Sequence, residues 1–485
     1  KADTDMGKLT GFMEYERVER PERRISERIK DYKEFHTPLS ETEQKKQAAR
    51  CMNCGVPSCQ WGQLLEGKVI GCPLNNLVPE FNDALYHDEN DLALQRLLKT
   101  NPFPEFTGRV CPALCEKACT CGLNEDPVSI RDNEYAIIER AFAEGKMKPL
   151  LQSVRSKKKI AVIGSGPSGL SAADWLNKRG HQVSVYEAAD RFGGLLMYGI
   201  PNMKLDKEVI SRRISLMKKE GVSFLANHAI TTVQQADELQ NQYDAVILAC
   251  GSRSPRKLAL EMPAKGAYYA VDYLTQVTAD LLNHVTNPIA EHKHAVIIGG
   301  GDTGNDCVAS CLRQHCASVT QLEIMPEPPE ERTADNPWPE WPNVKKTDYG
   351  QAEAIEVFGV DPRRYKTTVK AIQCDESGAV QSLTIVKTER QRNEQGRMVF
   401  VNQPGSEEEI PCDLLLVAMG FAGCTQEIAE AFDLPLQNGK VAAEGHHVKD
   451  HLFTAGDMHI GQSLVVRAIK EGLDCAEAVD QYLIG

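Results

Sequence analysis

Short apolar runs that end at a glycine or an acidic residue recur in the last two thirds of the chain. The run 159–164 (KIAVIG) leads through a glycine turn into a segment with helical spacing, and a second apolar run ends at Glu187. The same order recurs from His294 to Glu323. Strand, glycine turn, helix and strand in this order are typical of a βαβ unit. The pattern therefore predicts two dinucleotide-binding sites.

The regions around these units are also patterned. Apolar runs at 244–251 and 413–420 predict further strands, and the segment from His451 predicts a strand, a Gly-Asp turn and a helix. The first 150 residues are polar and rich in proline, with helical spacing at 90–99 and 133–145. The predicted fold is α/β, with two nested Rossmann-like domains after a mostly helical domain. We expect domains at 1–150, 157–290, 291–412 and 413–485, with a basic, solvated linker at 155–159.

Charge and hydropathy exclude several classes of function. The formal net charge of −13 argues against a nucleic-acid partner, because such proteins concentrate basic charge. No apolar run approaches the ~18 residues that cross a bilayer, and the polar start lacks the apolar core of a signal peptide. These features predict a cytoplasmic enzyme without a membrane partner. The chain begins at Lys1, and Met6 is an alternative native start.

The first glycine loop has the features of a dinucleotide site. Gly164 allows the tight turn, Gly166 lets the backbone approach a pyrophosphate, and Gly169 lets helix pack on strand. The pyrophosphate would lie at the positive end of the helix, and Glu187 is placed for the ribose hydroxyls. The predicted loop residues are Gly164, Ser165, Gly166, Pro167, Ser168 and Gly169.

The second loop predicts another dinucleotide site, formed by Gly299, Gly301, Asp302, Thr303 and Gly304. Its second strand ends at Glu323. A carboxylate there would repel a 2′-phosphate and accept hydrogen bonds from a free ribose, which favours NADH over NADPH. Arg332 or Arg313 could still supply a cation for NADPH.

The cysteines are unevenly spread. Eight of the 16 lie between residues 51 and 121 with short spacings. Such groups bind iron-sulfur clusters or structural zinc. We favour iron-sulfur, because Cys307 and Cys311 on the helix of the second unit have the spacing of buried core thiols, which leaves a redox reaction at the dinucleotide sites no other electron outlet.

Several motifs together carry a family resemblance. The segments CGVPSC, GRVCPALC, GSGPSGL, GGLLMYGIPNMKLDK, GGGDTGNDC, NPWPEWP and GQSLVVRAIKEG resemble those of the small (beta) subunits of bacterial glutamate synthase, from about residue 7 to the C-terminus. Individual motifs recur in dihydropyrimidine dehydrogenase and in ferredoxin:NADP oxidoreductase. NPWPEWP, with LEIMP in place of an arginine pair, resembles the NADH-using branch.

The resemblance implies which dinucleotide binds where. The TAGD segment (454–457) resembles the second flavin fingerprint of two-dinucleotide reductases, in which the aspartate holds the ribityl chain of FAD. FAD is therefore assigned to the first site and NAD(P)H to the second, inserted one. The further flavin-lining residues that this implies are Arg191, Gly193, Gly194, Leu195, Lys204, Gly456, Asp457, Ser463 and Leu464.

The resemblance also implies a division of the cysteines between two 4Fe-4S clusters. Counting alone gives eight thiolates for eight positions and would include Cys121. The family pattern instead places Glu134 in the eighth position, although an acidic residue there also suits a helix start. The implied ligands are Cys51, Cys54, Cys59 and Cys119 for one cluster, and Cys72, Cys111, Cys115 and Glu134 for the other.

The implied activity is the electron-input half of glutamate synthase, an enzyme of ammonia assimilation. NAD(P)H would reduce FAD, and the clusters would pass electrons to a large (alpha) subunit with FMN and a 3Fe-4S cluster, which makes L-glutamate from 2-oxoglutarate and glutamine. A hetero-oligomer is expected. Two alternatives stay open: a stand-alone NAD(P)H reductase for ferredoxin or a pyrimidine, and a non-catalytic scaffold held together by its clusters.

Overall fold

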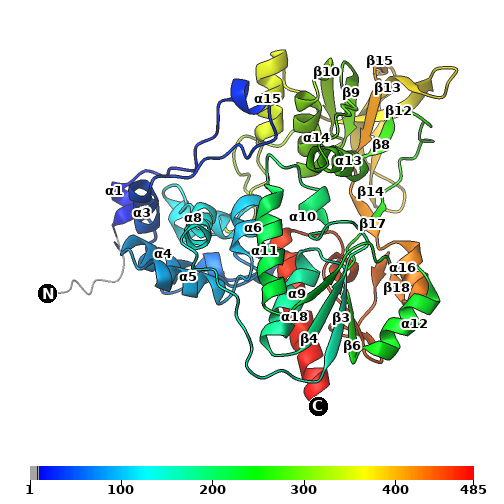
Figure 1. Cartoon of the computed structure of the whole chain (residues 1–485). Helices are drawn as coiled ribbons and strands as arrows, with labels where there is room; N and C mark the ends of the chain where they lie inside the picture. The colour runs from blue at the N-terminus through cyan, green and yellow to red at the C-terminus, as the bar shows by residue number, and fades with distance from the viewer. Residues whose placement is uncertain (1–7, 9) are drawn as a thin grey trace.

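Two parallel β-sheets form the centre of the C-terminal two thirds of the computed structural model, which describes residues 8 and 10–485 (Figure 1). The first sheet has helices on both faces, and the second has helices on one face and an antiparallel sheet on the other. The first sheet has the strand order β20-β21-β6-β3-β4-β5, and only β20 runs antiparallel to its neighbour. Its central strands β3 and β6 are buried except for Lys159, because their other residues are all apolar. The strands are β3 (Lys159–Ile163), β4 (Gln182–Tyr186), β5 (Ser223–Leu225), β6 (Ala245–Leu248), β20 (His447–Lys449) and β21 (Leu452–Thr454).

The helices of this first unit come from two parts of the chain, one before and one after the unit that is inserted into it. The long C-terminal helix α18 packs against α9, the helix that follows the first glycine loop (Figure 1). Short strand pairs, β7 with β17 and β18 with β19, lie at its edge. The elements are α9 (Pro167–Lys178), α10 (Leu195–Tyr198), α11 (Lys207–Lys219), α12 (Val233–Gln242), α16 (Gln426–Ala431), α17 (Asp457–Ile460), α18 (Val465–Ile484), β7 (Ser254–Pro255), β17 (Phe421–Gly423), β18 (Leu436–Gln437) and β19 (Lys440–Val441).

The second unit is inserted between β6 and β21 of the first. It has a parallel sheet, β11-β10-β9-β16-β8, and an antiparallel sheet built on β13. The predicted α/β class with two nested units is thereby confirmed. The elements are β8 (Ala267–Tyr269), α13 (Ala270–Leu282), β9 (His294–Ile298), α14 (Asp302–Arg313), β10 (Ser318–Leu322), α15 (Tyr349–Phe358), β11 (Arg363–Arg364), β12 (Thr367–Cys374), β13 (Val380–Arg392), β14 (Met398–Asn402), β15 (Glu408–Pro411) and β16 (Leu414–Val417).

The inserted unit is larger than the expected range 291–412. Strand β16 pairs with β9, and β8 pairs with β16, so the second sheet draws strands from both sides of that range. The chain passes between the units beside the β7–β17 pair. The expectation that the run at 413–420 belongs to the first unit is therefore wrong. An apolar run predicts a buried strand but does not predict which of two sheets the strand joins.

The N-terminal module is helical, with one small hairpin. Its apolar residues belong to the same buried cluster as the first unit, so the two share a continuous core. The buried pair between Arg213 of α11 and Glu105 of α6 also joins them. The elements are α1 (Gly11–Glu14), α2 (Ile25–Arg28), α3 (Glu41–Ala49), the 3₁₀ turn η1 (Ser58–Gln60), β1 (Gln63–Leu65), β2 (Lys68–Ile70), α4 (Val78–Tyr86), α5 (Asn90–Leu98), α6 (Pro104–Val110), α7 (Leu114–Lys117), the 3₁₀ turn η2 (Thr120–Leu123) and α8 (Ile130–Ala143).

An N-terminal arm, residues 20–37, leaves this module and packs on the inserted unit. Figure 1 shows it as the blue segment that reaches α15. The Phe35 ring stacks on Tyr349 with centroids 4.6 Å apart. Arg28 Nε donates to Glu353 Oε1 at 2.7 Å, and Arg313 Nη1 donates to Glu353 Oε2 at 2.6 Å. The arm thus ties the helical module to the inserted unit.

Replacing Glu353 with alanine is expected to destabilise this contact strongly. The side chains of Arg28, Arg313 and Glu353 are all 1% exposed or less. The change would leave the buried Arg313 guanidinium without a carboxylate and would leave Arg28 only Glu22, whose side chain is 48% exposed. Losing one partner of a buried pair costs about 3–5 kcal/mol. Denaturant unfolding and hydrogen exchange of residues 20–37 would measure the loss. Glu356→Ala, at an exposed position of the same helix, is the control, and an equal loss there would contradict the prediction.

Across residues 8 and 10–485, no helix combines the length and the apolar character that a bilayer span requires.

Candidate functional site

The loop after β3 packs tightly at two glycines and leaves space at a third. Gly164 has φ of +104°, and a Cβ there would lie 2.4 Å from the Ala249 carbonyl oxygen. A Cβ at Gly169 would lie 2.0 Å from the Gly164 carbonyl oxygen. At Gly166 nothing lies within 4 Å of the added atom. This combination fits a turn held by close packing, with one open side on which a pyrophosphate can approach the backbone.

A cavity of about 1000 Å³ joins the two glycine loops. Most of the residues predicted for FAD line it, together with three predicted for the nicotinamide. The buried Ser168 hydroxyl has no hydrogen-bond partner in the structure, so it is available to a bound group. The predicted residues in the lining are Gly164, Ser165, Gly166, Pro167, Ser168, Glu187, Gly194, Leu195, Lys204, Asp457, Ser463, Leu464, Gly301, Asp302 and Thr303.

Other predicted residues lie outside this lining. Gly456 packs on Ser168, where an added Cβ would meet the serine Cβ at 2.7 Å. Arg191 contacts surface groups, donating to the Tyr198 hydroxyl at 3.0 Å and to Asn283 at 2.8 Å. Residues that support the loops without lining the cavity are Gly169, Gly193, Gly299, Gly304, Glu323 and Gly456.

Glu187 lies at the end of the second strand of the first unit and is 5% exposed. Its Oε2 accepts hydrogen bonds from the Ser165 backbone NH at 3.1 Å and from the Ser165 hydroxyl at 2.5 Å, while Oε1 accepts from the Ala189 NH at 3.0 Å. The carboxylate is therefore held at the mouth of the glycine loop, where a ribose beside the pyrophosphate would meet it.

Asp457 and Lys204 are two charged residues of the cavity wall. Burial raises the pKa of Asp457 to about 6, although the Ser463 hydroxyl donates to it at 2.8 Å and opposes the shift. Burial alone would lower the pKa of Lys204, but the carboxylates of Asp306 and Asp302 raise it to about 12. Lys204 Nζ lies 3.2 Å from Asp306 on α14, so a permanently cationic side chain stands between the two loops.

Sequence reasoning missed part of the cavity wall. Residues 228–231 and 250–253 line it, after β5 and β6 respectively, and Gln462 lines it before α18. Ligands of open parallel sheets bind outside the carboxyl ends of the strands. The apolar run that ends at Gly251 could therefore have predicted that 250–253 line the cavity. The strand β5 has only three residues and gives almost no such signal for 228–231.

The second loop repeats the packing of the first. An added Cβ would lie 2.4 Å from the Ala418 carbonyl oxygen at Gly299 and 2.3 Å from the Gly299 oxygen at Gly304, and would meet nothing within 4 Å at Gly301. Glu323 closes the far side: its Oε1 accepts from the Met325 NH at 2.8 Å, and its Oε2 would lie 2.0 Å from a Cβ at Gly300. The carboxylate thus touches the loop itself.

Neither proposed alternative cation is free to face this carboxylate. Arg332 donates to the backbone oxygens of Asn336 at 3.2 Å and Glu340 at 2.8 Å. Arg313 is bound to Glu353 under the N-terminal arm. Cys307 and Cys311 are fully buried in the core of the inserted unit, which confirms their interpretation as core thiols.

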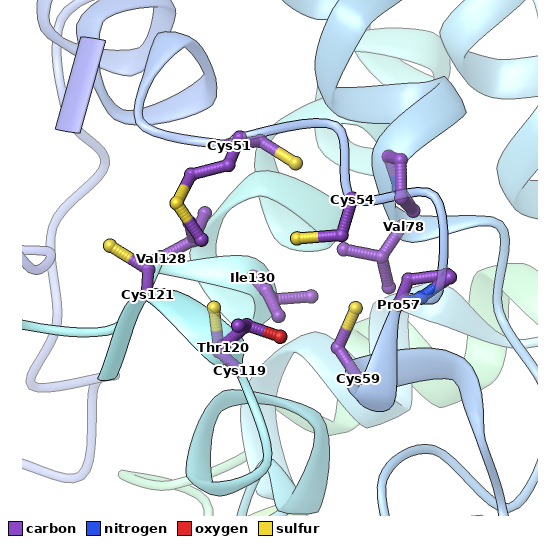
Figure 2. Close-up of a pocket in the computed structure, with 12 residues that line it drawn as sticks. Cys51, Cys54, Pro57, Cys59, Val78, Cys119, Thr120, Cys121, Val128 and Ile130 are labelled. Carbon is purple, nitrogen blue, oxygen red and sulfur yellow. The ribbon is translucent and has the colours of Figure 1, made fainter. Parts of the chain in front are cut away.

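Five of the N-terminal cysteines line one small pocket, and four of them are the predicted ligands of one cluster. Cys51, Cys54, Cys59 and Cys119 line it, and Figure 2 shows the sulfur atoms of Cys54, Cys59 and Cys119 facing a common space. Backbone NH groups lie against two of the sulfurs, that of Asn53 at Cys51 and those of Cys121, Gly122 and Val128 at Cys119. Burial raises the pKa of Cys51 to about 11, so cluster or metal binding would release protons.

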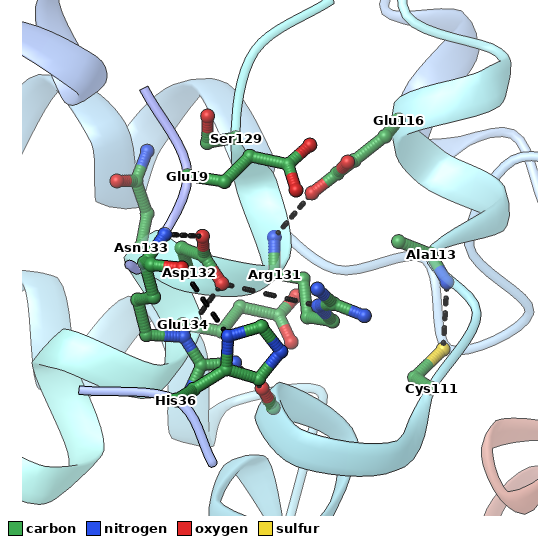
Figure 3. A network of polar contacts seen from close by, with 12 residues as sticks. Glu19, His36, Cys111, Ala113, Glu116, Ser129, Arg131, Asp132, Asn133 and Glu134 are labelled. Carbon is green, nitrogen blue, oxygen red and sulfur yellow. Dashed lines mark hydrogen bonds and ion pairs between the residues drawn. The ribbon is translucent and has the colours of Figure 1, made fainter. Parts of the chain in front are cut away.

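A second set lies beside the first. Burial raises the pKa of Cys72, Cys111 and Cys115, and the nearby Glu134 carboxylate raises each of them further. Ala113 NH donates to Cys111 Sγ at 3.4 Å, as Figure 3 shows. Glu134 is 4% exposed, and its oxygens accept from Asn76 Nδ2 at 2.8 Å and Thr107 Oγ1 at 3.3 Å. Burial raises the pKa of Glu134 to about 7.

Cys121 belongs to the neighbourhood of the first set. It lines the same pocket, its thiol donates to the Asp126 carbonyl at 3.4 Å, and Figure 2 shows its sulfur to one side of the space that the other thiols face. Its thiol lies near those of Cys119 and Cys54 rather than near the second set.

The second set lies between the first set and the cavity. Val110 and Pro112, on either side of Cys111, line the cavity that holds the glycine loops. On the other side, the Cys72 thiol is close enough to raise the pKa of Cys59. Cavity, second set and first set therefore follow one another through the protein.

Comparisons with known proteins agree with this arrangement. The family described as pyridine nucleotide-disulphide oxidoreductase matches residues 158–472, and that described as dihydropyrimidine dehydrogenase domain II, 4Fe-4S cluster, matches residues 28–146. Among solved structures, FprA from Mycobacterium tuberculosis in complex with NADPH is similar over 68% of this chain and 85% of that one, with a TM-score of 0.53 and 19% identity, which shows a shared fold only.

Full-length relatives are more similar. The glutamate synthase [NADPH] small chain of Bacillus subtilis (strain 168) is 46% identical, with 99% of both chains covered, and that of Escherichia coli (strain K12) is 32% identical, with 97% and 98% covered. The glutamate synthase [NADH] of Saccharomyces cerevisiae is 44% identical over 98% of this chain, which spans 22% of that protein. The resemblance seen in the motifs is confirmed, and the chain belongs to the family of glutamate synthase small chains.

Proposed function

We propose that the chain is the electron-input subunit of glutamate synthase and oxidises NAD(P)H for a larger partner. The observation that carries this proposal is the single cavity that touches both glycine loops and, through Val110 and Pro112, the cysteine module. A hydride donor and a hydride acceptor can meet there, and the cysteines that would hold a buried redox group lie next to them. Family membership supports the same role.

FAD fits the first loop and the nicotinamide dinucleotide fits the second. The open space at Gly166 and Gly301, the unpartnered Ser168 hydroxyl and the held Glu187 carboxylate supply what a pyrophosphate and a ribose require. Lys204 stands between the loops and would orient both cofactors by its charge. When bound, these groups supply hydride transfer to FAD and single-electron transfer through the clusters.

Two 4Fe-4S clusters fit the cysteine module better than zinc. The family model that matches residues 28–146 is described as a 4Fe-4S cluster domain, and backbone NH groups at Cys51, Cys111 and Cys119 would stabilise the thiolates that hold such clusters. A zinc site would carry no electrons out of the cavity. We assign Cys51, Cys54, Cys59 and Cys119 to one cluster, and Cys72, Cys111, Cys115 and Glu134 to the other. The position of Cys121 beside the first set, which is complete without it, supports Glu134 as the eighth ligand.

The partner is the large subunit of glutamate synthase. The relative from Saccharomyces cerevisiae contains the matching segment within a chain of which this protein spans 22%, as expected if the two parts work together. We propose that this partner carries FMN and a 3Fe-4S cluster and forms L-glutamate. Co-purification tests the proposal: glutamate formation from 2-oxoglutarate and glutamine should require both chains. Full turnover of ferredoxin or a pyrimidine without the partner would favour a stand-alone reductase instead.

We propose that NADH is the preferred donor, and Glu323→Arg should shift the preference toward NADPH. The Glu323 carboxylate faces the loop at the position of the adenosine ribose, and Arg332 and Arg313 are engaged elsewhere. Removing a repulsion and adding a charged hydrogen bond is worth about 1–3 kcal/mol, or roughly 5–150-fold in kcat/KM for NADPH. Stopped-flow flavin reduction with both donors would measure it. A wild type that strongly prefers NADPH would refute the assignment.

A further inference from the structure

Three potential metal ligands converge at the edge of the first sheet, away from the cofactor cavity. His446 lies in the turn before β20, His459 on the short helix α17, and Glu471 on α18. One nitrogen or oxygen atom from each lies within 4.8 Å of those of the others. None of the three lines the cavity.

The His446 ring is oriented as a metal ligand requires. Its Nδ1 lies 3.0 Å from the Thr454 carbonyl oxygen, which can only accept, so Nδ1 carries the ring proton and Nε2 keeps its lone pair. The backbone bond from Thr454 NH to the His446 carbonyl, at 2.9 Å, holds the turn in place. A backbone carbonyl behind an imidazole is the usual way in which proteins fix the tautomer of a metal-binding histidine.

The other two groups are already close together. His459 Nδ1 lies 2.7 Å from Glu471 Oε2, and the His446 and His459 ring centroids are 4.9 Å apart. Bonds of about 2.0–2.1 Å to a tetrahedral ion would place ligand atoms about 3.3 Å apart. The remaining gap is therefore within reach of side-chain rotation. A simple hydrogen bond between His459 and Glu471 explains one of these contacts but gives the oriented His446 ring no partner.

The site is open on one side. The His459 side chain is 21% exposed and that of Glu471 16%, so an ion can enter and a water molecule can complete its coordination. Two imidazoles and a carboxylate suit divalent first-row transition metals and select against magnesium and calcium, which prefer oxygen ligands.

We propose that His446, His459 and Glu471 bind one divalent transition-metal ion of the zinc class. Such an ion would link the β20 turn to α17 and α18, two helices that bound the flavin side of the cavity. This site is separate from the thiolate sets and from the proposed electron transfer.

Calorimetric titration of the holoprotein, with FAD and iron in place, with Zn²⁺ alone tests the proposal. We expect one equivalent to bind, with at least tenfold weaker binding in each of His446→Gln, His459→Gln and Glu471→Gln. His447→Gln is the matched control, because that neighbouring ring binds the carbonyl of its own turn, at Asp450. FAD and iron contents equal to wild type would show that the variants are folded.

The ligand shell gives a second test, which needs no variant. Zinc-edge X-ray absorption of the wild-type holoprotein should show only nitrogen and oxygen neighbours at about 2.0–2.2 Å. A sulfur shell at about 2.3 Å would mean that the ion binds to cysteine and would overturn the proposal. Undiminished binding by the double variant His446→Gln/His459→Gln would overturn it as well. Either result would leave the proposed function intact, because no cofactor contact is involved.

Discussion

Gly301→Glu is expected to abolish flavin bleaching by NADH while FAD stays bound. Nothing lies within 4 Å of an added Cβ at this position, and the residue has extended backbone with φ of −78°, so the fold tolerates a side chain. The carboxylate would instead occupy the space of the nicotinamide pyrophosphate. Like charges in contact cost several kcal/mol, so the reduction rate at fixed NADH should fall by about two orders of magnitude or more.

The equivalent change in the first loop is the control. Gly166 has the same open geometry, and Gly166→Glu should lose FAD itself, whereas Gly301→Glu should keep FAD that NADH no longer reduces. Anaerobic absorbance spectra with NADH, together with the FAD content of each purified variant, would separate the two effects. If Gly301→Glu lost FAD, the two dinucleotides would have to exchange sites.

Removing Glu134 is expected to cost one iron-sulfur cluster, whereas removing Cys121 should cost none. Glu134 is buried with the thiols of the second set, and the Cys121 thiol lies beside a first set that already has four cysteines. Cys121→Ala should keep about eight irons per chain and Glu134→Ala about four, as the loss of one of two 4Fe-4S clusters requires. Iron analysis and low-temperature EPR would measure both.

Two further variants show whether the loss of iron in Glu134→Ala comes from a missing ligand. Glu134→Gln retains an oxygen that can bind iron and should keep most of the lost signal, while Cys72→Ala should remove the same cluster as Glu134→Ala. If Cys121→Ala lost a cluster and Glu134→Ala kept both, Cys121 would be the eighth ligand and Glu134 only a buried polar group of α8.

Local patterns predicted the parts of the molecule that depend on neighbouring residues in the sequence. The two glycine loops, the strands before them and the clustering of the cysteines follow from short-range spacing, and the family resemblance supplied the roles of Asp457 and Lys204. What could not be predicted depends on contacts between distant segments. Three features could be seen only in the folded structure: the pairing of β8 with β16, the part of the cavity wall at 228–231, and the hydrogen bonds that Arg332 makes within its own loop.

The contacts of the arm formed by residues 20–37 could not be predicted from the sequence either. Arg28 and Phe35 lie in a charged, proline-containing segment without helical or strand periodicity, and their partners Glu353 and Tyr349 lie more than 300 residues away. No spacing rule connects such pairs.

Through that arm, loss of the clusters proposed for the helical module would affect the nicotinamide unit. Cluster binding stabilises the folded helical module by mass action, so cluster damage would favour its unfolding. Unfolding would withdraw Arg28 and Phe35 from Glu353 and Tyr349, and Tyr349 donates to Asp306, the partner of Lys204 between the two loops. Oxidative loss of the clusters would then disturb the position of Lys204 without any direct contact. A subunit with damaged clusters would be expected to oxidise NADH more slowly.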